Sequence, residues 1–112
     1  MRKALKVSAE LATEVIDLDA PQGSLKVLQD AVGGFIQPIG VGNVELVINE
    51  EGKIFDLPYN EYGTRILRKA YSTDDYIVGD IVVTGGVDDE GEWIGLTDEQ
   101  VTQFAYLAEL AV

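Results

Sequence analysis

Apolar and polar residues alternate in short runs along most of the chain, and this period of two is typical of half-buried strands. The predicted strands cover residues 4–9, 13–18, 44–48, 53–57 and 76–83, with a shorter extended segment at 35–39. Pro38 restricts that shorter segment to an edge or an end of a sheet. The run at 76–83 is rich in β-branched residues and is the predicted central strand, although Gly79 weakens it.

Apolar residues spaced three and four apart predict three helices. They cover residues 25–32, 62–70 and a last segment that begins at Thr97 and runs to the C-terminus. Ser24 is placed to cap the first helix, and Thr97 with Gln100 forms the capping box of the last one. The order ββαββαβα indicates an α+β fold in one domain, residues 1–112, with two or three helices on one face of a small, mostly antiparallel sheet.

Charge is distributed very unevenly along the sequence. Eight basic and ten acidic residues precede or include Lys69, whereas ten acidic residues and no basic residue follow it. The net charge of −12 should repel nucleic acids and membrane surfaces and should attract basic proteins. The chain has no cysteine, and its apolar runs are far too short to span a membrane. We therefore expect a cytoplasmic protein, without direct contact to nucleic acid or membrane.

Four motifs occur in order between about Asp17 and Gln100. They are Leu28-Gln29-x-Ala31-Val32-Gly33-Gly34-x-Ile36, Asn49-Glu50-Glu51-Gly52-Lys53, Leu57-Pro58-x-Asn60-x-x-x-Thr64 and Gly79-Asp80-x-Val82-Val83-x-Gly85. Together they resemble a family of small domain-of-unknown-function proteins that is common in actinobacteria, their phages and plasmids. The resemblance implies an accessory protein of a mobile element that acts against host defence, but it implies no activity. Family members often have a basic residue where this chain has Glu61, which argues against an anion contact there.

Catalysis has little support in this sequence. Histidine and cysteine are absent, so the usual general bases, nucleophiles and soft metal ligands are missing. The acidic segment Asp88–Glu92 does not fit an EF-hand, because the residue that should be its first aspartate is Gly86. We interpret this segment as a solvated turn. The sequence predicts a protein that is not an enzyme and needs no cofactor or metal.

Binding has more support, from residues in and before the second helix. Arg65, Arg68 and Lys69 form the one concentrated cationic strip, and Asn60 and Thr64 precede it on the same segment. Guanidinium groups bind phosphates through forked hydrogen bonds, so this strip could hold a phosphate-bearing small molecule. The simpler alternative pairs Arg65 with Glu61 and leaves the other bases solvated. With the neighbouring turn, the candidate ligand-binding residues are Asn49, Glu50, Asn60, Thr64, Arg65 and Arg68.

Three functions remain open on this evidence. The first is a non-enzymatic protein that binds a nucleotide-like small molecule and thereby counters host defence. The second is an acidic DNA mimic that inhibits a basic, nucleic-acid-binding host protein, which the ten acids after Lys69 suggest. The third is a structural module that forms a homo-oligomer through an edge strand or the C-terminal helix.

Overall fold

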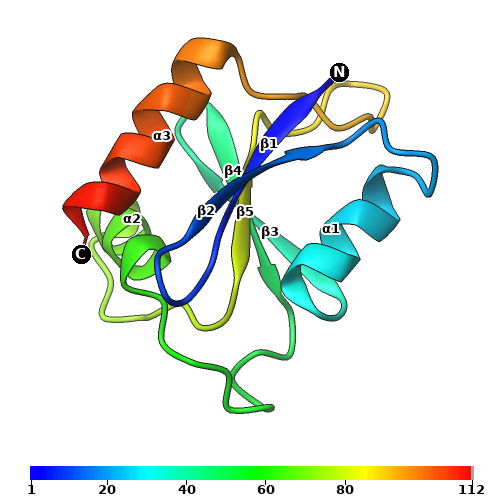
Figure 1. The fold of residues 1–112 in the computed structure, drawn as a ribbon. Coiled ribbons are helices and arrows are strands. Elements are labelled where there is room, and N and C mark those ends of the chain that lie inside the picture. The colour runs from blue at the N-terminus through cyan, green and yellow to red at the C-terminus, as the bar shows by residue number, and fades with distance from the viewer. Residues whose placement is uncertain (112) are drawn as a thin grey trace.

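Eight elements make up the fold, and all strand pairs are antiparallel. The computed structural model describes residues 1–111 (Figure 1). In chain order the elements are β1 (Lys3–Val7), β2 (Thr13–Asp17), α1 (Ser24–Val32), β3 (Ile36–Val41), β4 (Val44–Asn49), α2 (Glu61–Tyr71), β5 (Ile81–Thr84) and α3 (Asp98–Leu110). The sheet has the order β2-β1-β5-β4-β3, which confirms the predicted α+β class.

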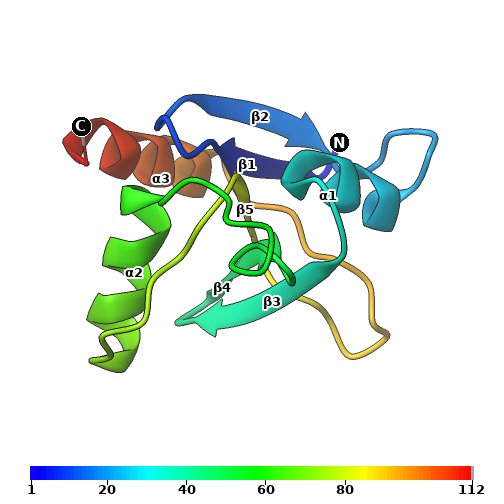
Figure 2. The same cartoon turned by 90° about the horizontal axis from the view of Figure 1, so that it is seen from below.

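The central strand β5 is buried on both faces, because helices cover both sides of the sheet. Ile81 and Val83 pack with α2 and α3, whereas Val82 packs with α1. Figure 2 shows α1 on one side of the sheet and α2 and α3 on the other. The prediction that the helices share one face is therefore wrong. The consecutive apolar residues of β5 are the physical reason, since a strand with only one covered face needs a polar residue at every second position.

The strand predicted at 53–57 is absent from the structure. β4 already has β3 on one side and β5 on the other, so no edge remains for a further partner. Residues 51–57 instead form consecutive turns, in which Phe55 N–H donates to the Glu51 carbonyl and Leu57 N–H to the Gly52 carbonyl. The real hairpin joins β3 to β4, with β3 as an edge strand.

The strand predicted at 76–83 is shorter than expected. Gly79 adopts a left-handed φ of 80°, which interrupts the extended backbone, and the regular strand begins only at Ile81. Residues 76–79 run beside the segment before α2, where Tyr59 and Val78 form an isolated bridge. An irregular segment thus lies where the sequence predicted a strand.

The helix ends agree with the sequence in part. The capping box at Thr97 and Gln100 is present at the start of α3. The N-cap of α1 is Gly23, so the prediction that Ser24 caps this helix is wrong. At the other end of α1, Gly33 has the left-handed conformation of a C-cap, as the Gly33-Gly34 pair predicted. Within the described part of the chain, no helix combines the length and the apolar character that crossing a membrane requires.

Candidate functional site

Asn60 and Thr64, two of the predicted ligand-binding residues, are buried at the start of α2. The Oδ1 of Asn60 accepts from Gly63 N–H at 2.9 Å, which makes Asn60 the N-cap of this helix. Its Nδ2 donates to the carbonyls of Gly79 at 2.8 Å and Val7 at 3.3 Å. The structure thus places Asn60 between α2, β1 and the segment before β5, with no exposed surface.

Thr64 and Arg68 attach the irregular segment 74–77 to α2. The Thr64 hydroxyl accepts from Ile77 N–H at 2.9 Å and donates to the Ile77 carbonyl at 3.4 Å. The guanidinium of Arg68 donates to the carbonyls of Asp74 and Asp75 at 3.1 and 3.0 Å. Both residues therefore hold the backbone that follows α2 in a fixed position.

Arg65 lies apart from these contacts. Its Nε donates to Glu61 Oε1 at 2.7 Å, one helical turn away, and the guanidinium side chain is exposed. This contact lowers the pKa of the Glu61 carboxyl below its ordinary value. The structure has the pairing that the simpler sequence interpretation expected, and Arg65 does not line the pocket described below.

Asn49 and Glu50 lie at the end of β4, with different surroundings. Asn49 is buried, where its Nδ2 donates to the Val32 carbonyl at 3.1 Å and its Oδ1 accepts from Glu51 N–H at 2.8 Å. Glu50 is exposed, and its N–H donates to the Phe35 carbonyl at 2.8 Å. Both residues line a pocket between the end of β4 and segment 75–78.

This pocket, hereafter the β4-end pocket, has a volume of about 150 Å³. Its apolar lining comes from the sheet, from the turns after β4 and from the segment before β5, with the residues Ile39, Ile48, Ile54, Ile77 and Val78. Its polar lining includes Gln37, Glu50, Lys53, Asp75 and Tyr76. An apolar floor with a few polar groups at its edge is the usual composition of a small-molecule site.

Lys53, Asp75 and Tyr76 form one cluster at the edge of the β4-end pocket. The Lys53 ammonium lies 4.3 Å from the centroid of the Tyr76 ring and also pairs with the Asp75 carboxylate. The hydrogen bond from Lys53, with a second one from the Tyr76 N–H, lowers the pKa of the Asp75 carboxyl below its ordinary value. The Tyr59 ring lies beside that of Tyr76, with centroids 6.2 Å apart.

The six predicted residues therefore differ in their relation to this pocket. Asn49 and Glu50 line it, Thr64 and Arg68 hold its wall at 74–77, and Asn60 anchors the next part of the chain. The sequence prediction missed Lys53, Asp75 and Tyr76. In the sequence, Tyr76 follows two acids directly and begins the predicted strand at 76–83, and Lys53 is the last residue of the second motif. These features were the available signal.

Charges that are segregated in the sequence are paired in the structure. Four bases of the first half contact acids that follow Lys69; the pairs are Arg2–Glu92, Lys3–Asp98, Lys6–Asp80 and Lys53–Asp75. The uneven distribution of charge along the sequence therefore does not keep these bases and acids apart in the fold. The pairs of Arg2, Lys3 and Lys6 form because β1 lies next to β5 in the sheet and because the start of β1 contacts the chain before α3.

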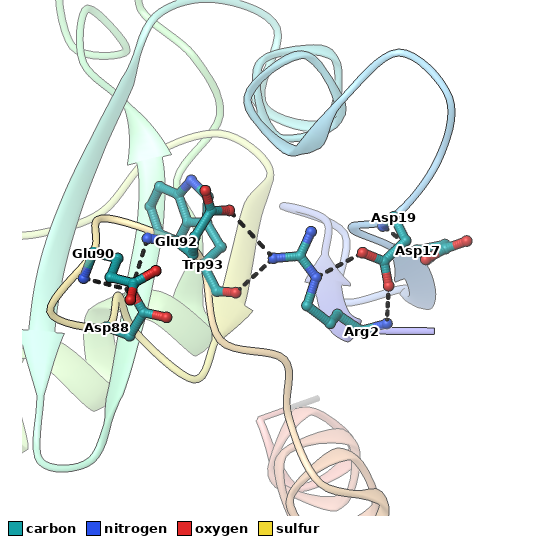
Figure 3. Close-up of polar contacts among 7 residues, drawn as sticks. All are labelled: Arg2, Asp17, Asp19, Asp88, Glu90, Glu92 and Trp93. Carbon is teal, nitrogen blue, oxygen red and sulfur yellow. Dashed lines mark hydrogen bonds and ion pairs between the residues drawn. The ribbon is translucent and has the colours of Figure 1, made fainter.

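Figure 3 shows the contacts of Arg2, among them its ion pair with Glu92 at 4.0 Å. Its Nε donates to Asp19 Oδ1 at 2.7 Å, and its Nη1 donates to the Trp93 carbonyl at 2.8 Å.

The same figure shows the acidic turn, where Asp88 Oδ1 accepts from the N–H groups of Glu90 and Glu92 at 2.9 and 3.0 Å. These contacts agree with a turn at 88–92 closed by its own first residue. No group of acidic side chains in residues 1–111 is arranged to hold a metal ion.

Comparison with known proteins gives a family and nothing further. A family model described as "Domain of unknown function (DUF3846)" matches residues 1–109. A search of curated proteins found no match, and neither did a search of solved structures.

Proposed function

The chain belongs to the DUF3846 family, whose function is unknown, and we propose that it is a non-catalytic protein that binds a nucleotide-like small molecule in the β4-end pocket. The observation that carries this proposal is the Lys53–Asp75–Tyr76 cluster at the edge of an apolar floor. A planar heterocycle can lie on such a floor, and a cation beside an aromatic ring suits an anionic group attached to it.

The size of the pocket limits what it can hold. Pockets for drug-sized ligands have volumes of roughly 300–1,000 Å³, whereas this one has about 150 Å³. A single ring system fits inside, so a sugar and a phosphate must lie at the edge. At that edge, the Lys53 ammonium can pair with the phosphate in place of Asp75. The carboxylate of Glu50 can accept a hydrogen bond from a sugar hydroxyl or an amino group.

We propose that the protein is not a catalyst because of the side chains that it contains. The whole chain lacks histidine and cysteine, and the pocket combines carboxylates and one lysine without a nucleophile beside a base. We further propose that the ligand is a signal of host defence and that the protein serves a phage or a plasmid. This part of the proposal rests on the resemblance of the four motifs alone.

Calorimetric titration against nucleosides and linear and cyclic nucleotides tests the proposal. Lys53→Met should weaken binding of a phosphate-bearing ligand about tenfold or more, because a hydrogen bond to a charged group contributes roughly 1.5–3 kcal/mol. Lys26→Met is the matched control, since Lys26 also pairs with an aspartate on the surface but lies outside this pocket. Equal loss in both variants, or no heat from any nucleotide, would contradict the proposal.

The acidic DNA mimic stays the alternative for a protein partner. Ion pairs occupy Asp75, Asp80, Glu92 and Asp98. The other acids after Lys69, which are left to imitate phosphates, are Asp74, Asp88, Asp89, Glu90, Glu99 and Glu109. Retention of a basic host protein at low salt and its release at high salt would favour this alternative.

The third function, a homo-oligomeric module, is favoured by α3, where Tyr106 and Leu110 are each more than half exposed. Light scattering measures the oligomeric state directly.

A further inference from the structure

A second hollow lies against the C-terminal end of α1. Its volume is about 480 Å³, and its lining consists of Lys26, Gln29 and Asp30 of α1, with Gly33, Gly34, Phe35 and Glu51. None of these residues lines the β4-end pocket. The hollow can therefore be occupied and tested independently of the function proposed above.

One buried side chain fixes two walls of this hollow. The Asn49 amide donates to the Val32 carbonyl at the end of α1 and accepts from the Glu51 N–H, so it connects the helix end to the turn that carries Glu51. Gly34 permits this approach, because a Cβ at that position would lie 3.0 Å from Asn49 Nδ2. The two walls are thus held in place before any ligand arrives, which reduces the entropy that binding would cost.

The chemistry of the hollow suits a positive charge. The C-terminal end of α1 carries the negative end of the helix dipole, and its last turn contains no basic residue. Lys26 and Asp30 both line the hollow and are paired with each other at 2.9 Å, whereas Glu51 forms no ion pair within residues 1–111. The Phe35 side chain is 63% exposed, and an accessible aromatic face attracts cations.

We propose that this hollow binds a guanidinium or ammonium group carried on an apolar stem. The Glu51 carboxylate and the end of α1 face the charge, and the Phe35 ring packs against the stem or the guanidinium plane. Such a group can come from a free organic cation or from an arginine of a basic protein. Both sources present the same chemistry to the hollow.

Amide chemical shifts of the labelled protein test this proposal, with N-acetyl-arginine amide as the probe. We expect saturable shifts at Gly33, Gly34 and Glu51, and none with the neutral N-acetyl-citrulline amide. Glu51→Gln should weaken the probe at least fivefold, and Glu90→Gln, which removes an exposed charge elsewhere, should leave it unchanged. Shifts that do not saturate, that follow every acidic segment, or that persist in Glu51→Gln would overturn the proposal.

Two further measurements separate the effect of packing from that of charge and show whether the cation belongs to a small molecule or to a protein. Phe35→Leu keeps an apolar side chain but removes the aromatic face, so it should weaken the arginine probe while the unliganded spectrum stays folded. A short peptide with two arginines separated by glycines is the other probe. If it binds at least tenfold more tightly than the blocked amino acid, and loses that gain in Glu51→Gln, the occupant is a protein segment. Equal affinity of peptide and amino acid indicates a small cation.

Discussion

Asn60 offers the sharpest test of how α2 is held in the fold. Asn60→Ala removes the cap of α2 and leaves the carbonyls of Gly79 and Val7 without this buried donor. Loss of an N-cap costs about 1 kcal/mol, and a buried group without its partner costs roughly 1–3 kcal/mol. With the 3.3 Å contact to Val7 taken at the low end, we expect a loss of about 3–5 kcal/mol in the free energy of unfolding.

Asn60→Asp separates the two halves of this effect. Aspartate is as good an N-cap as asparagine, so the bond to Gly63 N–H survives. The substitution removes both amide donors, however, and places a carboxylate against two carbonyl oxygens. We therefore expect Asn60→Asp to destabilise the protein at neutral pH at least as much as Asn60→Ala does.

Urea unfolding followed by circular dichroism measures both variants. Asn43→Ala is the matched control, because Asn43 is exposed in the turn between β3 and β4, and surface changes of this kind stay within about 0.5 kcal/mol. A stability of Asn60→Asp close to that of the unchanged protein would show that the cap alone matters. A loss below about 1 kcal/mol in Asn60→Ala would refute the reasoning from buried hydrogen bonds altogether.

Three further predictions concern other contacts and are also measured by urea unfolding. Tyr62→Phe should lower the free energy of unfolding by about 1 kcal/mol, because the ring stays packed and only its 3.0 Å hydrogen bond to a carbonyl of α3 is lost; no change would contradict this. Gly63→Ala should cost about 1–3 kcal/mol despite its better helix propensity, since the added Cβ would lie 2.9 Å from Ile77 Cγ2; a more stable variant would refute it. Arg2 lowers the pKa of the Asp19 carboxyl below 3.8, so this contact stabilises the fold above that pH and its contribution disappears as the pH falls through the lowered pKa. Arg2→Met should therefore lose less free energy of unfolding on acidification below pH 3.8 than the unchanged protein does. The same pH dependence in both proteins would contradict this.

Much of the fold could be predicted from the local pattern. The three helices, the first hairpin and the capping box at Thr97 depend on residues close in sequence, and the structure confirms them. The covering of both faces could also have been inferred, since Ile81, Val82 and Val83 form an uninterrupted apolar run in a strand. Which helix covers which face depends on contacts between distant segments, and the local pattern does not contain that information.

The error at residues 53–57 has a different cause. The alternation in this segment resembles a strand, but Ile54 is 78% exposed and Asp56 has a left-handed φ of 55°. Strand pairing needs an available edge, and both edges of β4 are already occupied by β3 and β5. A strand-like sequence without an edge to join becomes a loop, and only the order of the strands in the sheet shows this.

Of the six ligand-binding residues that the sequence predicts, Asn49 and Glu50 line the β4-end pocket. The two asparagines also make backbone contacts that the sequence analysis did not predict. The amides of Asn49 and Asn60 bond to backbone groups of irregular segments, at Glu51 and Gly79, and to the carbonyls at the ends of α1 and β1. Lys53 and Asp75 escaped notice, since their pairing joins residues that are 22 positions apart.

The two buried asparagines connect the fold to the proposed binding sites. Each one joins an irregular segment to the end of a regular element, Asn49 to α1 and Asn60 to β1 and α2. Asn49 fixes the turn between the β4-end pocket and the hollow at α1, and Asn60 fixes the chain beside segment 75–78. Because rigid walls lower the entropic cost of binding, a substitution at Asn60 should weaken a ligand of the β4-end pocket, and one at Asn49 a ligand of the hollow, although neither residue lines the site in question. Side chains at the pocket edge, such as Lys53, should instead change ligand affinity and leave stability nearly unchanged.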